Sequence, residues 1–123
     1  MATFTKFNSF VEALAEKVHN LGSDTLTVAL CASANAPVAT NTQLSNLTQI
    51  SYTNLSSRVL TTSSSSQSAG TYKLVIADLT LTASGGSVAP FRYVVIYNDT
   101  ATNDELIGFY DYGSDLTLAN WLS

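Results

Sequence analysis

The 123-residue chain is poor in the side chains from which chemical sites are built: it has one His, one Cys, five Lys plus Arg, and 11% charged residues against 46% hydrophobic ones. Enzymes orient nucleophiles and tune pKa values with His, Cys, Lys and paired carboxylates, so this composition predicts a non-enzymatic structural or binding module. The net charge of −4 argues against a nucleic-acid partner, because binding the phosphate backbone needs a Lys and Arg footprint.

The length predicts a single domain over residues 1–123, with an N-terminal arm and helix at 1–22 and a β-domain at 23–123. No apolar run approaches the roughly 18 residues of a membrane span, so no membrane partner is expected. Glu12, Glu16 and Lys17 interrupt what would be the apolar region of a secretory signal. We therefore expect synthesis in a cytoplasm.

The first element is an amphipathic helix that ends before Gly22. Ser9 and Glu12 could form its capping box, with Thr5 as an alternative start. The spacing i, i+3, i+4, i+7 of one helix face is shown by Phe7, Phe10, Val11, Leu14, Val18 and Leu21. We expect this face to be buried.

Large apolar residues also mark both ends of the chain. The aromatic strip at Phe4, Phe7 and Phe10 could cover the domain's own sheet or dock on a partner subunit. Near the C-terminus, Trp121 and Leu122 could pack back on the core or insert into a neighbour. The residues predicted for a partner interface are Phe4, Phe7, Trp121 and Leu122.

After residue 24 the apolar period changes to two, and Leu26, Val28 and Leu30 predict a half-buried strand. Cys31 ends this run, and we interpret it as a small buried hydrophobe. A charge-free loop follows at 32–43. The spacing of apolar residues in 44–50 fits either one helical turn or an irregular edge.

The Ser-rich segment 61–68 and the segment 71–77 predict a β-hairpin with its turn at Gly70, although a disordered linker is the alternative. A strand should continue beyond residue 77, because apolar residues alternate there before the reversal at Gly85-Gly86. One face of that strand would hold Val75, Ala77, Leu79, Leu81 and Ala83.

Residues 91–97 are apolar on both faces apart from Arg92, which predicts a central strand. Residues 105–112 form the returning strand, in which Gly108 indicates a bulge or a close backbone approach. The whole pattern predicts a mainly β fold: an antiparallel β-sandwich or barrel-like domain with one N-terminal amphipathic helix.

Few side chains could carry chemistry. His19 with Ser23 and Asp24 suggests a triad, but no nucleophile elbow is present, and we interpret His19 as a surface residue favoured by the helix dipole. One His and one Cys cannot form a structural zinc site. Acidic residues cluster near the C-terminus, where the turn 99–105 could hold calcium or be an ordinary solvated turn. We predict no catalytic residue, no metal site and no cofactor.

An aromatic strip in the last two strands is the remaining candidate for binding. Such a strip can belong to the core, anchor a protein interface or stack on a sugar. Its members are Tyr93, Tyr97, Phe109, Tyr110 and Tyr112.

Residues 85–100 read GGSVAPFRYVVIYNDT and residues 106–113 read LIGFYDYG. Together with the opening MATFTKFNSFVE and the segment TVAL at 27–30, these stretches resemble small virion structural proteins of tailed bacteriophages. The similarity is one of pattern over most of the chain, and it implies a virion component without catalytic residues.

Two functions follow from the resemblance and the composition. The first is a capsid decoration or cement protein, made in the host cytoplasm, that binds the major capsid protein on the assembled shell as a homotrimer and stabilises it. The alternative is a tail-associated carbohydrate- or receptor-binding module that uses the Tyr strip and the acidic turn. A sugar site typically needs an exposed Trp or Tyr with flanking polar residues; because the single Trp is near the C-terminus and Arg92 lies inside the most apolar strand, we favour the first.

Overall fold

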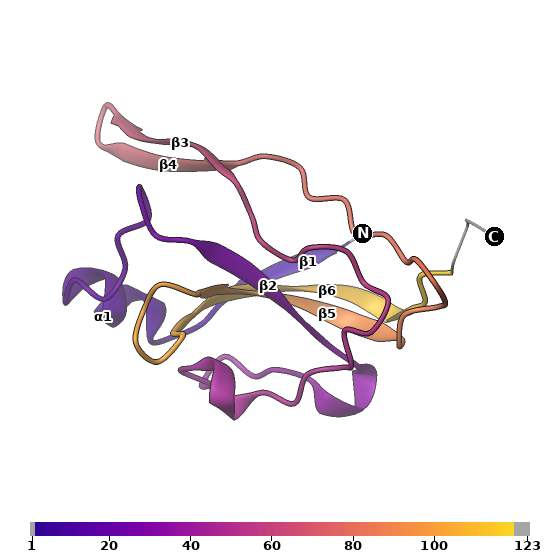
Figure 1. Ribbon diagram of the computed structural model, residues 1–123. Coiled ribbons are helices and arrows are strands. Elements are labelled where there is room, and N and C mark those ends of the chain that lie inside the picture. Colours follow the sequence, from indigo (N-terminus) through magenta and orange to yellow (C-terminus); the bar gives the residue numbers. More distant parts are fainter. Residues whose placement is uncertain (1, 120–123) are drawn as a thin grey trace.

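The computed structural model describes residues 2–119 and is mainly β, with antiparallel sheets and one short helix near the N-terminus (Figure 1). The larger sheet has the strand order β1-β6-β5-β2, from Thr3–Lys6, Leu106–Leu116, Phe91–Asn98 and Leu26–Cys31. A separate two-stranded sheet joins β3 (Thr62–Ser68) to β4 (Thr71–Ile76). Neither sheet closes on itself, so the finer prediction of a sandwich or barrel is not confirmed.

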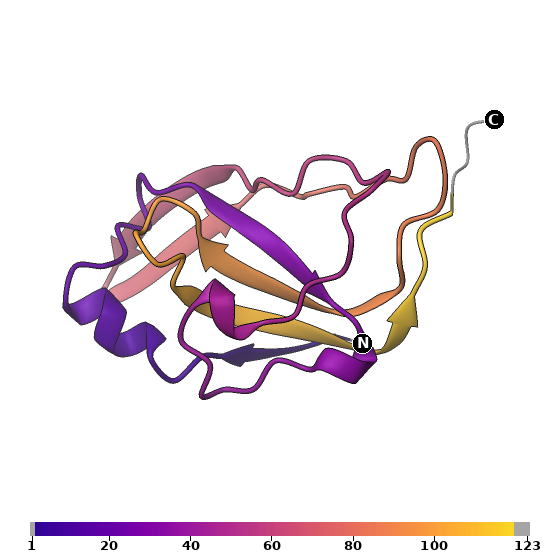
Figure 2. The same ribbon diagram turned by 60° about the horizontal axis from the view of Figure 1, so that its bottom comes forward.

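One face of the larger sheet carries the main core. The segment between β2 and residue 50, with the short 3-10 helices η1 (Ser33–Asn35) and η2 (Leu44–Asn46), runs across this face (Figure 2). The predicted helical turn is therefore confirmed at η2, where Leu44 and Leu47 cover the core. The buried residues of this core are Phe7, Ala29, Cys31, Tyr93, Val95, Tyr97, Leu106 and Phe109.

The opposite face packs Val28, Leu30 and Phe91 against partly buried side chains of residues 50–60, 79–81 and Leu118. Residues 50–60 also close the outer edge of β2, because backbone hydrogen bonds join Leu60 N to Leu26 O at 2.8 Å and Val28 N to Arg58 O at 3.0 Å. With both faces and the edge covered, all six residues of β2 are buried, and the prediction of a half-buried strand was wrong.

The prediction of a long N-terminal helix was also wrong. The chain first forms β1 against β6, and α1 spans only Phe10–Ala15 with no buried residue. Ser9 is the N-cap as predicted, but its side chain makes no capping hydrogen bond. Val11 is 52% exposed and Leu14 is 42% exposed, so the predicted buried helix face does not exist beyond its first residue, Phe7, and the loop residue Leu21. None of the described helices is long and apolar enough to cross a membrane.

The β3–β4 hairpin is confirmed, with Ala69 and Gly70 in the turn at positive φ. It stands above the larger sheet (Figure 1). The expected continuation to residue 83 was wrong, since β4 ends at Ile76. Residues 82–84 instead bond to the irregular segment 54–56, through Ser56 N to Thr82 O at 3.0 Å and Ser84 N to Asn54 O at 2.9 Å.

The central position of β5 is confirmed, and β6 is the returning strand. Gly108 has both features that were expected as alternatives. The register between β5 and β6 shifts beside it, and the ring of Phe4 lies so close over Gly108 that a Cβ there would collide with it. Only a residue without a side chain leaves room for the Phe4 ring at this position, while backbone pairing with β6 joins β1 to the sheet.

Candidate functional site

A cleft of about 360 Å³ lies on the face of β5 and β6 that the 32–50 segment leaves free. We call it the sheet cleft. The floor of the sheet cleft is formed by Val94, Ile96, Tyr110 and Tyr112. One wall is formed by the segment that follows β4. The residues of that wall and its surroundings are Val28, Leu60, Ile76, Ala77, Asp78, Leu79 and Leu81. An apolar concave surface of this kind suits an apolar side chain of a partner.

Tyr110 and Tyr112, which line the sheet cleft, and the neighbouring Phe4 are exposed aromatic side chains, and we call these three the aromatic surface. Phe4, Tyr110 and Tyr112 are 50%, 37% and 42% exposed. Phe4 faces Tyr110 across the β1–β6 pairing, with ring centroids 4.9 Å apart, and lies over Gly108. The backbone thus holds the Phe4 ring in place although half of its surface is open to solvent.

An ion pair supports this end of β6. Arg92 donates from Nε and Nη2 to the two carboxylate oxygens of Asp111, at 2.8 and 3.2 Å. Gly113 N also donates to Asp111 Oδ1 at 2.8 Å. The hydrogen bonds from Arg92, and then that from Gly113, lower the pKa of Asp111. These contacts hold Asp111 and Gly113, the two residues on either side of Tyr112, and so restrict the position of the Tyr112 ring.

His19 is not on the surface, and this prediction was wrong. It is 5% exposed, its ring lies 5.4 Å from that of Phe10, and its Nδ1 is 2.9 Å from Asn98 Nδ2. Asn98 Nδ2 also donates to Asp24 Oδ2 at 2.6 Å, and Asn98 Oδ1 accepts from the backbone N of Thr100 and Ala101. Since those two N–H groups can only donate, the amide must turn Nδ2 toward His19, whose Nδ1 is therefore the unprotonated acceptor.

This arrangement holds His19 neutral. Burial lowers its pKa below 6.5, and the carboxylates of Glu105 and Asp24 only partly oppose this effect. No hydroxyl, thiol or lysine nucleophile takes part in the His19 contacts that the structure describes, and Ser23 is absent from them. The cluster joins the loop after α1 to the end of β5 and to the turn at 99–101, which is a structural role.

The lowered pKa of His19 predicts a pH dependence of stability. As the pH falls below about 6.5, the unfolded chain binds a proton that the folded chain excludes, so the free energy of unfolding should fall. The slope should be at most about 1.4 kcal/mol per pH unit, and it should vanish above pH 7. Urea unfolding at pH 7.5, 6.5 and 5.5 measures it. His19→Gln, which retains an acceptor for Asn98, should lack this slope; an unchanged slope would assign it to other groups.

The other residues considered as possible chemical sites are Cys31, which is in the core, and the acidic turn 99–105. Cys31 is buried as expected, and burial raises the pKa of its thiol to about 11, which leaves it protonated and unreactive at neutral pH. In the acidic turn, partial burial and the neighbouring carboxylates of Asp99 and Glu105 raise the pKa of Asp104. Within residues 2–119, no group of three or more His, Cys, Asp or Glu side chains could hold a metal ion.

The structure divides the predicted binding residues. Phe4 is on the surface, whereas Phe7 is fully buried, so Phe7 belongs to the core and its assignment to an interface was wrong. Trp121 and Leu122 lie outside the described residues. Of the Tyr strip, Tyr93, Tyr97 and Phe109 are core, and only Tyr110 and Tyr112 are exposed.

The structural role of Asn98 was not predicted from the sequence. The available signal was an Asn directly after the most apolar strand, followed by Asp-Thr, because Asn side chains at such places bond to backbone N–H groups two or three residues on.

Comparison of the chain with protein-family models, with curated proteins and with solved structures finds no match.

Proposed function

We propose that the chain is a non-enzymatic virion structural protein of a tailed bacteriophage, and specifically a decoration protein that binds the major capsid protein on the assembled shell and stabilises it. The observation that carries this proposal is the aromatic surface: Tyr110 and Tyr112 are exposed in the sheet cleft, and Phe4 is exposed next to Tyr110. Large aromatic side chains that enter a partner's pockets are the usual energetic anchors of protein interfaces.

The electrostatics of the chain support contacts of this kind. The aromatic surface and the sheet cleft include one charged residue, Asp78, and the chain has only 11% charged residues. Apolar and main-chain contacts should therefore supply most of the affinity for the shell. Salt screens exposed ion pairs but leaves apolar burial intact, so binding should persist at high ionic strength.

A closed homotrimer remains part of this proposal. Shells built from repeated subunits offer threefold and quasi-threefold axes, and a trimer places three identical docking surfaces on such a site, which raises avidity. The sandwich-like fold class also stays a proposal, in which irregular segments on both faces of the larger sheet take the place of a second full sheet.

We expect Phe4→Ala and Tyr110→Ala each to weaken binding to the shell by about tenfold or more, because each removes an aromatic anchor worth over 1 kcal/mol. Binding can be measured by co-sedimentation with heads, lacking the protein, of the phage that encodes the chain. Both positions are exposed, so the midpoint of thermal unfolding should change little. Tyr72→Ala, at a tyrosine that is 47% exposed on the hairpin, is the matched control and should bind like the parent protein.

Two results would contradict the proposal. Binding to heads that is lost at high salt would show that ion pairs dominate. Failure of the parent protein to bind heads at all, with binding to tail tips or to host-surface glycan through Tyr110 and Tyr112, would favour the tail-associated module. The observation that favours that second candidate is the exposure of Tyr110 and Tyr112, since exposed tyrosine rings can stack on a sugar.

A further inference from the structure

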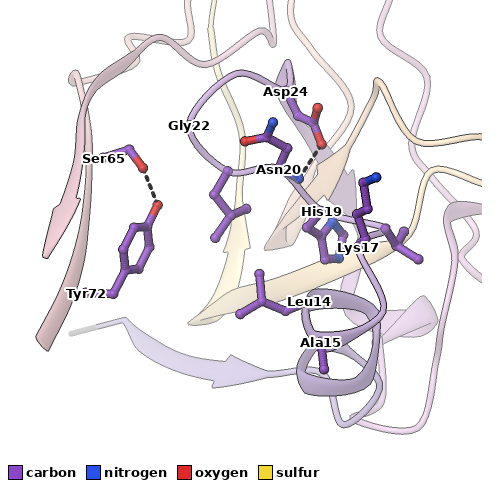
Figure 3. Close-up of a pocket in the computed structure, with 11 residues that line it drawn as sticks. Leu14, Ala15, Lys17, His19, Asn20, Gly22, Asp24, Ser65 and Tyr72 are labelled. Carbon is purple, nitrogen blue, oxygen red and sulfur yellow. Dashed lines mark hydrogen bonds between the residues drawn. The ribbon is translucent and has the colours of Figure 1, made fainter. Parts of the chain in front are cut away.

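A second cleft, of about 620 Å³, lies between the β3–β4 hairpin and the loop that follows α1. We call it the hairpin cleft; Figure 3 shows its residues. Ser65 and Tyr72 form the wall on the hairpin side, and Leu14 and Asn20 face them from the α1 side (Figure 3). It shares no residue with the sheet cleft. Its volume lies within the usual range of small-ligand sites.

Two of the large apolar side chains that line the hairpin cleft are open to solvent. Tyr72 is 47% exposed and Leu14 is 42% exposed, and both line it. Leu21, which also lines it, is buried. The hydroxyl of Tyr72 is held by Ser65 Oγ at 2.6 Å, which fixes the orientation of the ring. A fixed, exposed aromatic ring offers a flat face on which an apolar ring face of a ligand can stack.

The polar groups around that ring are held in place but have free hydrogen-bonding capacity. Asp24 Oδ2 accepts from Asn20 N at 2.8 Å and from Asn98 Nδ2 at 2.6 Å, while Asp24 Oδ1 makes no hydrogen bond within the described part of the chain. The side-chain amide of Asn20 is likewise without a partner there. His19 lines the cleft too, and its Nε2 is the one buried side-chain nitrogen or oxygen that lacks a partner among residues 2–119.

The charges at the hairpin cleft exclude several ligand classes. Among the residues that the structure describes, Lys17 and Asp24 are the charged ones that line the cleft, and they form no ion pair with each other. One positive and one negative group balance, so neither a phosphate-bearing ligand nor a polycation is favoured. The unpaired amide and carboxylate oxygen would be left unsatisfied by a purely apolar ligand. A neutral ligand with several hydroxyl groups and one apolar face fits all of these features.

We propose that the hairpin cleft binds a saccharide ring, stacked on Tyr72 and hydrogen-bonded through its hydroxyl groups to Asn20 and Asp24. The observation behind it is the juxtaposition of a fixed, exposed Tyr ring with unpaired polar side chains across one cleft. This inference is independent of the aromatic surface and of binding to a capsid, and either can fail without the other.

The test is a titration of the ¹⁵N-labelled full chain with free glucose, galactose, mannose, rhamnose and N-acetylglucosamine, followed by amide chemical shifts. At least one sugar should give saturable shifts in residues 14–24, 65 and 72, with millimolar affinity. Tyr72→Ala and Asn20→Ala should each weaken that binding by about tenfold, because each removes a principal contact. Tyr72→Phe keeps the ring and should lose less.

Tyr110→Ala is the matched control, because it removes another exposed tyrosine ring from the other cleft, and it should bind the sugar like the parent protein. Three results would overturn the proposal: no saturable shift with any of the five sugars, shifts centred on Tyr110 and Tyr112 instead, or unchanged affinity in both Tyr72→Ala and Asn20→Ala. Backbone spectra of each variant establish that the exposed substitutions leave the fold intact.

Discussion

Replacing Phe7 by Ala should lower the free energy of unfolding by about 3–5 kcal/mol, because it opens a cavity in a core that cannot fully collapse. Phe7 is fully buried, and its ring centroid lies 5.2 Å from that of Phe109. Its backbone N also donates to Ile107 O at 3.1 Å, so the position joins β1 to the sheet and to the core at once. Urea unfolding at neutral pH measures the loss.

Leu14→Ala is the matched control for this prediction. The sequence pattern alone assigns Leu14 and Phe7 to the same buried helix face, and it would predict large losses at both. Leu14 is 42% exposed, so its substitution should change stability by no more than about 0.5 kcal/mol. Similar large losses at Leu14 and Phe7 would mean that α1 is longer and more deeply packed than the structure shows.

Asn98→Ala should be the most damaging polar substitution, with a loss of about 3 kcal/mol or more. The Asn98 side chain is fully buried and makes four hydrogen bonds: two from Nδ2, to His19 and Asp24, and two to Oδ1, from the backbone of Thr100 and Ala101. Its removal leaves the buried Nδ1 of His19 without a partner and breaks three part-buried hydrogen bonds, and a methyl group cannot replace them. Thermal and urea unfolding report the loss.

Asn103→Ala tests whether the loss at Asn98 comes from the buried network rather than from the turn. Asn103 lies in the same connection, but it is exposed, and its backbone N, not its side chain, bonds to Glu105. Its substitution should stay within about 0.5 kcal/mol. If Asn98→Ala proved equally mild, the polar cluster would be incidental to stability, and the pH dependence assigned to His19 would lose its structural basis.

The strands with strong local signals were predictable. The hairpin turn at Gly70, the apolar run of β5 and the Gly in β6 each carry their own signal, because turn chemistry and two-sided apolarity act over a few residues. The position of β5 inside the sheet followed from the same run, since a strand apolar on both faces must be covered on both.

The N-terminus was not predictable in this way. Phe4, Phe7, Phe10 and Leu14 fit a helical period, yet residues 3–6 pair with β6 and only a short helix remains. Pairing with a strand about a hundred residues later in the chain outweighs the local helical pattern. A short helix is only marginally stable by itself, so its internal hydrogen bonds do not prevent residues 3–6 from forming a strand. The same limit explains His19 and Asn98, which are far apart in sequence and meet only in the fold.

The candidate sites were predictable only in composition. The aromatic strip in the last strands was identified with core, protein interface and sugar platform as alternatives, but which of the five rings face solvent depends on which face of the larger sheet Leu44 and Leu47 cover. The hairpin cleft could not be foreseen, because Tyr72 and Asn20 lie on segments that no sequence signal brings together.

The order of strands in the larger sheet has a consequence for biosynthesis. Thr3 pairs with Asp111 and Lys6 with Gly108, so among residues 2–119 the first strand pairs with the last and with no other. A nascent chain from which β1, β2 and the hairpin have emerged still lacks the strand that joins β1 to the rest. The sheet can therefore be completed only after β6 has left the ribosome, and closing so long a loop makes this pairing a late and slow event in folding.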